Sequence, residues 1–202
     1  MKTRTIKVTT QGEGMEEALR LSEKVGNSCE LTKKEQLRLR LLSEELFGMI
    51  RSITGETQAD YWLEFKNKSF AVHLKAEVRL TQEMYEELIE VSTNRKNKAV
   101  RGFMGNIINM IEVMMLPQAE DYSMVSIGFM SLGNTAANYA GSGAYTWSMN
   151  QYVTKLEEGS SSDEDMELAR DDLEKSIVAK LSDEVTVSIS GSVAEITIYK
   201  AF

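Results

Sequence analysis

Residues 32–53 read TKKEQLRLRLLSEELFGMIRSI, and this stretch decides the fold that the sequence predicts. It opens with a capping box, in which Thr32 and Glu35 each satisfy one of the free N–H groups at a helix start. Apolar residues then recur every three or four positions as one stripe: Leu39, Leu42, Leu46, Met49, Ile50 and Ile53. Gly55 ends the pattern. We expect one helix of about 22 residues, roughly 33 Å long, which is enough to cross a small domain.

Two later segments alternate apolar and polar residues, which is the pattern of half-buried strands. Residues 61–65 and 70–78 alternate on either side of a short polar turn, and this predicts an antiparallel hairpin. Residues 184–200 predict a second hairpin that turns near Gly191.

The start of the chain adds a strand at residues 4–9 and a shorter helix, MEEALRLSEKV, directly after it. Strands that are joined as hairpins and separated by helices favour an α+β fold. We therefore expect a two-layer sandwich, in which a mixed or antiparallel sheet is covered by helices on one face.

The length of 202 residues fits a single domain over 1–202. Within it we expect a core of residues 3–116 and 184–202, interrupted by a helical insertion at 117–183. The insertion is rich in Met, Gly, Ala and Ser, and its pattern predicts helices near 122–133 and 143–157.

Further helices are expected before and at the end of the insertion. Thr81 caps a short one, and the apolar run NIINMIEVMML forms another that ends at Pro117. A last helical stripe is built from Met166, Ala169, Leu173, Ile177 and Leu181.

The net charge of −8 disfavours nucleic acid as a partner, because phosphate binding relies on clustered Lys and Arg. One basic loop, Asn94-Arg95-Lys96-Asn97-Lys98, is interpreted as solvated surface, although it could also meet an anionic ligand or an acidic partner. No apolar run approaches the roughly 18 residues of a membrane span, and the N-terminus lacks the apolar region of a signal peptide. Because Cys29 is the only cysteine, a cytoplasmic location is expected.

Catalytic and metal-binding motifs are missing from the sequence. A chain with one His and one Cys offers no zinc motif, and neither phosphate-binding glycine motif is present. His73 lies on a predicted strand, on the face opposite Val72 and Leu74, and is interpreted as an exposed or half-covered strand residue.

The middle of the long helix carries the pair Glu44-Glu45, whose side chains point about 100° apart on a helix and cannot share one proton. A solvated helix flank is the plain interpretation. However, LRLRLLSEELFGMIRSITG (37–55) resembles the long helix of the histidine-kinase-like ATPase domain, the GHKL superfamily, which includes bacterial anti-sigma serine kinases. The order of the predicted elements is similar to that fold, which implies a Bergerat-like sandwich.

The resemblance implies roles for several residues if ATP or ADP with magnesium is bound. Glu44 would orient water, and the position four residues on, where the family has a magnesium-binding asparagine, is Gly48. The segment Arg101-Gly102-Phe103-Met104-Gly105, with the helix after it, looks like the glycine motif that approaches the phosphates, so Arg101, Gly102 and Gly105 would bind nucleotide.

The same resemblance requires an aspartate and two glycines at the end of the second hairpin strand. The chain has Leu74-Lys75-Ala76-Glu77-Val78-Arg79 there, and Glu77 replaces the aspartate only if the register shifts. Valine and arginine would crowd a site where glycine lets a ligand approach closely. These departures argue against turnover of ATP, so no catalytic residue other than Glu44 is proposed and no metal site is expected.

The insertion collects Met and aromatic residues that suit an adaptable contact surface. The candidate partner-binding residues are Met124, Phe129, Met130, Tyr145, Trp147 and Tyr152. The plain interpretation is that such side chains simply fill the core beneath the helices.

Three hypotheses follow. The first is a degenerate GHKL-like regulatory protein that acts through protein contacts, with a nucleotide pocket that is vestigial or used for binding only. The second is an active ATP-binding protein or anti-sigma-type serine kinase. The third is an oligomeric scaffold built on the insertion.

Overall fold

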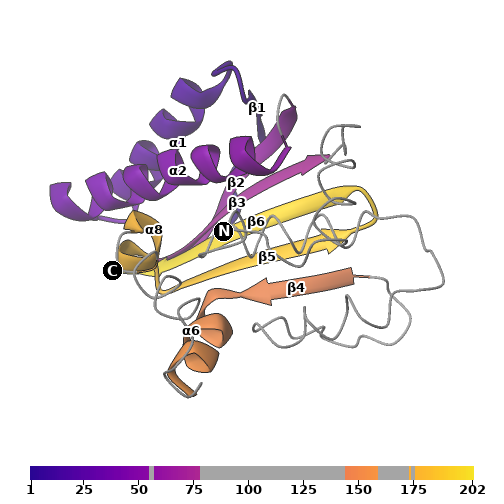
Figure 1. Ribbon diagram of the computed structural model, residues 1–202. Coiled ribbons are helices and arrows are strands. Elements are labelled where there is room, and N and C mark those ends of the chain that lie inside the picture. The colour runs from indigo at the N-terminus through magenta and orange to yellow at the C-terminus, as the bar shows by residue number, and fades with distance from the viewer. Residues whose placement is uncertain (55–56, 78–143, 159–172, 174–175) are drawn as a thin grey trace.

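The computed structural model describes residues 1–54, 57–77, 144–158, 173 and 176–202 (Figure 1). Several predictions from the sequence lie outside these residues: the helix after Thr81, the basic loop, the helix before Pro117 and the helix near 122–133. The described elements, in chain order, are β1 (Ile6–Thr9), α1 (Met15–Ser28), α2 (Lys33–Thr54), β2 (Gln58–Lys66), β3 (Ser69–Glu77), β4 (Ala144–Ser148), α6 (Met149–Glu158), α8 (Ile177–Leu181), β5 (Glu184–Ser190) and β6 (Val193–Ala201).

The six described strands form one sheet in the order β1-β2-β3-β6-β5-β4, and every pairing between them is antiparallel. Helices α1 and α2 lie side by side over one face of this sheet (Figure 1). The predicted α+β fold, with helices on one face of an antiparallel sheet, is therefore confirmed.

The long helix follows the prediction closely. The Thr32 amide donates to Glu35 Oε2 at 2.7 Å, and the Glu35 amide donates to Thr32 Oγ1 at 3.3 Å, which is the reciprocal bonding of a capping box. The expected apolar stripe is buried against the sheet at Leu39, Leu42, Leu46, Met49 and Ile50. Thus the stripe sets which side of α2 faces the core, and Phe47 joins it by packing on the Tyr61 ring of β2.

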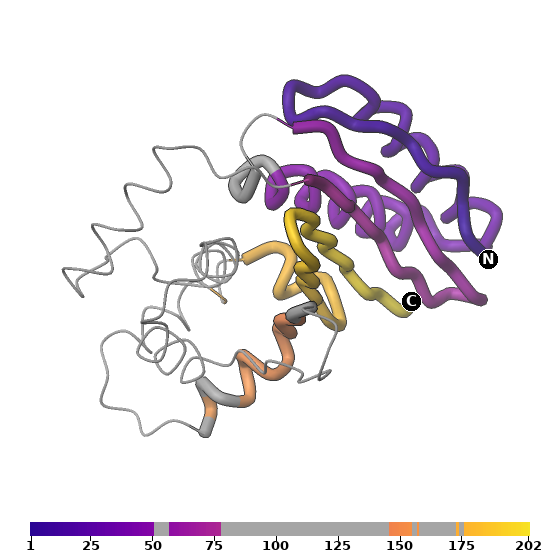
Figure 2. The backbone as a smooth tube through the Cα atoms, turned by 90° about the vertical axis from the view of Figure 1, so that its right-hand side faces the viewer, coloured from indigo at the N-terminus to yellow at the C-terminus, as the bar shows by residue number. Residues whose placement is uncertain are grey.

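Both predicted hairpins are confirmed. Strands β2 and β3 pair from Ala59 opposite Ala76 to Lys66 opposite Ser69, and β5 and β6 turn at Gly191, whose φ is +57°. Both chain ends lie at the β2–β3 turn, since the Met1 amine donates to the Phe65 carbonyl and the Phe202 amide donates to the Lys68 carbonyl (Figure 2).

The helix expected near 143–157 is wrong for its first residues. Ala144–Ser148 is strand β4, which pairs with β5 at the edge of the sheet, and the helix α6 begins only at Met149. Threonine and large aromatic residues suit a pleated, half-buried surface, and here Trp147 lies opposite Val187 in the core. The segment expected to be helical therefore contributes a strand.

The last helical stripe is not continuous. Ser176 has extended backbone angles and its hydroxyl accepts a hydrogen bond from the Ala179 amide, so α8 starts afresh at Ile177 with its own cap. Ile177, expected on the buried stripe, is 48% exposed, whereas Val178 is buried. None of the described helices is long and apolar enough to cross a membrane.

Candidate functional site

Glu44, the residue that the family resemblance singles out, lies on an exposed flank of α2 and is bound by an arginine. Arg40, one turn earlier, donates from Nε to Glu44 Oε1 at 3.0 Å and from Nη1 to Glu23 Oε1 of α1 at 2.5 Å. Glu16 Oε2, also on α1, is 3.9 Å from Nη2 of the same guanidinium. The hydrogen bonds to Glu23 and then Glu44 raise the pKa of Arg40, so this cation stays charged.

This arrangement makes the Glu44 carboxylate part of a surface ion-pair network that joins α2 to α1. Its side chain is 41% exposed, and it projects away from the stripe that packs on the sheet. Gly48, four residues on, is also exposed, and a Cβ placed there would meet no atom of the described residues within 4 Å. The two positions that the resemblance assigns to water and magnesium therefore lie one turn apart on the same exposed face of the helix.

Glu77, expected as a substitute for the adenine-binding aspartate, is exposed at the last position of β3. It lies opposite Val193 of β6, and its carbonyl accepts a hydrogen bond from Thr57 Oγ1 at 3.2 Å. Arg101, Gly102 and Gly105 lie outside the described residues. Glu44 is thus bound by Arg40 within α2, whereas the Glu77 backbone carbonyl is bound by Thr57, directly before β2.

The face of the sheet opposite α1 and α2 carries a cluster that the sequence did not predict. His73 lies between Trp62 of β2 and Thr197 of β6, because these three residues are cross-strand partners. Its imidazole stacks on the Trp62 ring with centroids 4.7 Å apart and planes 6° apart. Its Nδ1 atom is 3.0 Å from Glu195 Oε1 and 3.1 Å from Thr197 Oγ1.

His73 is only 9% exposed, so the expectation of an exposed or half-covered residue is wrong. The Trp62 ring and the two hydrogen-bond partners of Nδ1 cover the imidazole. These neighbours come from adjacent strands, so the sequence of β3 alone does not show them. The bond to His73 is also the main reason why the pKa of Glu195 is lowered. Strand alternation placed His73 on the correct face, but only the β3–β6 register reveals its hydrogen-bond partners.

The edge of this cluster is charged. Lys2 lies 4.4 Å above the Trp62 ring and 3.3 Å from Glu64, which also accepts a hydrogen bond from Trp62 Nε1. The hydrogen bond from Trp62 Nε1 lowers the pKa of Glu64 the most, and the hydrogen bond from Lys2 lowers it further. Chemically the cluster is a carboxylate–imidazole pair beside an aromatic ring. No group of three metal-ligating side chains occurs anywhere in the described residues.

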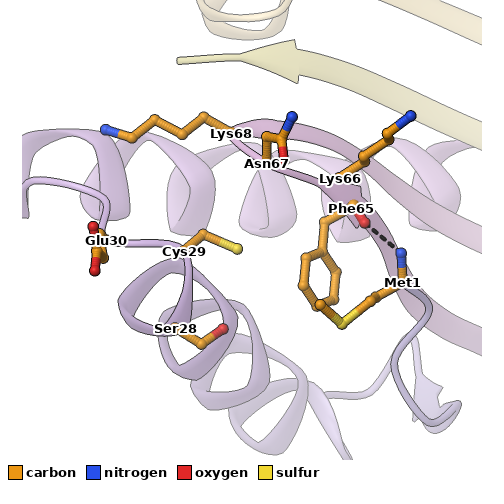
Figure 3. Close-up of a pocket in the computed structure, with 8 residues that line it drawn as sticks. All are labelled: Met1, Ser28, Cys29, Glu30, Phe65, Lys66, Asn67 and Lys68. Atoms are coloured by element: carbon orange, nitrogen blue, oxygen red, sulfur yellow. Dashed lines mark hydrogen bonds between the residues drawn. The ribbon is translucent and has the colours of Figure 1, made fainter.

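A pocket of about 540 Å³ opens between the end of α1 and the β2–β3 turn (Figure 3). The thiol of Cys29 is turned toward the side chains of Met1 and Phe65, while Lys66 and Lys68 lie at the strand side. This pocket is distinct from the Glu44 network, and the sequence did not predict it, since it depends on how α1 packs beside the hairpin.

Two of the predicted partner-binding residues belong to the core. Trp147 and Tyr152 are 0% and 1% exposed, and their ring centroids are 5.9 Å apart. Tyr145 lies opposite Ile189 in the β4–β5 register. Because Trp147 and Tyr152 pack with β5, we assign them to folding, and Met124, Phe129 and Met130 lie outside the described residues.

No family model, curated protein or solved structure matches this chain. The resemblance to the histidine-kinase-like ATPases therefore stays a hypothesis that depends on element order and on the residues of α2.

Proposed function

We propose that this protein is a degenerate GHKL-like regulatory protein that acts through protein contacts and does not turn over ATP. Its nucleotide pocket is vestigial or serves for binding only. The observation that carries the proposal is the pairing of Glu44 with Arg40 on an exposed helix flank, beside a glycine where the family has a magnesium-binding asparagine.

The Arg40 contact supports this proposal on chemical grounds. A carboxylate that orients water or takes up a proton needs an oxygen directed at the reacting group. Glu44 Oε1 instead accepts a hydrogen bond from Arg40 Nε at 3.0 Å. In addition, Gly48 brings no side-chain oxygen to a cation, and magnesium in proteins is held by oxygen ligands.

The order of the described elements supports the proposed ancestry. The chain begins β1-α1-α2-β2-β3 and ends β5-β6, with the long helix packed on β3 and β6. This order also favours the second candidate, an active ATP-binding protein or serine kinase of the anti-sigma type, because the scaffold that such a protein needs is the same.

An assay of phosphate release from ATP with magnesium separates these two functions. We expect the purified chain and Glu44→Gln to give the same rate, at the level of the buffer blank. Glu45→Gln is the matched control, since it removes a neighbouring carboxylate from the same helix. A rate that Glu44→Gln abolishes and Glu45→Gln preserves would establish the active enzyme and overturn the proposal.

Thermal unfolding with ATP or ADP and magnesium then distinguishes a vestigial pocket from one used for binding. A ligand present at 100 times its Kd stabilises the folded state by about 2.7 kcal/mol, which raises Tm by several degrees. An unchanged Tm identifies the pocket as vestigial, whereas a raised Tm without phosphate release identifies a binding-only site.

The protein-contact part of the proposal includes self-association. Light scattering at high protein concentration measures the mass directly. A mass above that of the 22.7 kDa monomer supports homo-oligomerisation, and a monomeric mass rules out the oligomeric scaffold and leaves a different protein as the partner.

A further inference from the structure

No further inference is drawn: the strongest candidate, the side-chain cluster of Trp62, His73, Glu195 and Thr197 on the face of the sheet opposite α1 and α2, carries nothing because no described cavity opens onto the buried Nε2 atom of His73 and nothing in the structure shows what covers that face.

Discussion

Tyr61 is a fully buried residue at which burial changes the protonation equilibrium. Its hydroxyl lies between α1 and α2, 2.7 Å from Ser22 Oγ and 2.9 Å from Ser43 Oγ, and all three side chains are buried. Burial raises the pKa of Tyr61 from 10.0 to about 12, because the phenolate would lose its hydration. The folded state therefore holds the neutral phenol over a pH range in which the unfolded chain ionises.

The sign of the pH dependence follows from this shift. The stabilisation is fully present below about pH 10 and is lost as pH rises from about 10 to about 12, a change of about 3 kcal/mol. Urea unfolding across this range should show the loss in the native chain, and Tyr61→Phe should show a smaller one. Tyr199→Phe is the control, since Tyr199 is 40% exposed. An equal loss of unfolding free energy with rising pH in the native chain and in Tyr61→Phe would contradict the assignment to Tyr61.

Among the glycines in the described part of the chain, Gly14 is the one at which a side chain is least tolerable. Its φ is +73°, and a Cβ would lie 2.0 Å from the carbonyl oxygen of Lys7 in β1. We expect Gly14→Ala to lower the free energy of unfolding by more than about 3 kcal/mol. Backbone strain of about 1–3 kcal/mol adds to the steric overlap with the Lys7 carbonyl oxygen. Chemical denaturation measures this loss.

Gly191→Ala is the matched control for Gly14→Ala. Gly191 also has a positive φ, +57°, but a Cβ there meets no atom of the described residues within 4 Å. This variant should lose only the strain contribution, about 1–2 kcal/mol. If both variants lose the same stability, the contact with Lys7 has no energetic consequence.

At the scale of elements, the first turn of α2 is stabilised by residues that are close together in the sequence. Thr32→Ala removes the acceptor for the Glu35 amide and should cost about 1 kcal/mol of stability, whereas Thr32→Ser keeps the hydroxyl and should cost little. Urea midpoints of the two variants test this difference. A Thr32→Ser variant as unstable as Thr32→Ala would indicate that the methyl group, and not the cap, stabilises the helix.

The same capping box shows why some elements could be predicted from sequence. The bonds of α2, like the β2–β3 and β5–β6 turns, join residues close in the chain, so local patterns contain the necessary information. β4 could not be predicted in this way. Its five residues lie in a Gly- and Ser-rich stretch, and pairing with β5, about 40 residues further on, decides that Ala144–Ser148 is extended.

The candidate sites also differ in how far local sequence predicts them. The Arg40–Glu44 pair has the i,i+4 spacing of helix ion pairs and can be recognised in the sequence, whereas the link to Glu23 depends on how α1 packs on α2. The His73 cluster joins residues separated by 122 and 124 positions. Without the β3–β6 register, His73 could be placed on a face of the sheet and beside Trp62 of the hairpin, but not given its hydrogen-bond partners Glu195 and Thr197.

At the scale of the whole molecule, the described elements share one hydrophobic core. Buried side chains run continuously from Ile6 on β1 to Trp147 on β4, at opposite edges of the sheet, and Tyr152 and Val178 join them from α6 and α8. A continuous core predicts a single cooperative unfolding transition, although β4 and α6 lie within the segment 117–183 that the sequence sets apart as an insertion.

The chain's two tryptophans make this cooperativity measurable, because Trp62 is on β2 and Trp147 is at the far edge of the sheet. Trp147→Phe leaves fluorescence that reports on the β2 side, and Trp62→Phe leaves fluorescence that reports on the β4 side. Each substitution changes stability, so the fluorescence midpoint of each variant is compared with its own far-UV circular dichroism midpoint. We expect the two midpoints to coincide in both variants. A β4-side signal lost at lower denaturant than the circular dichroism would instead make this edge a separate unit, docked on a core that folds without it.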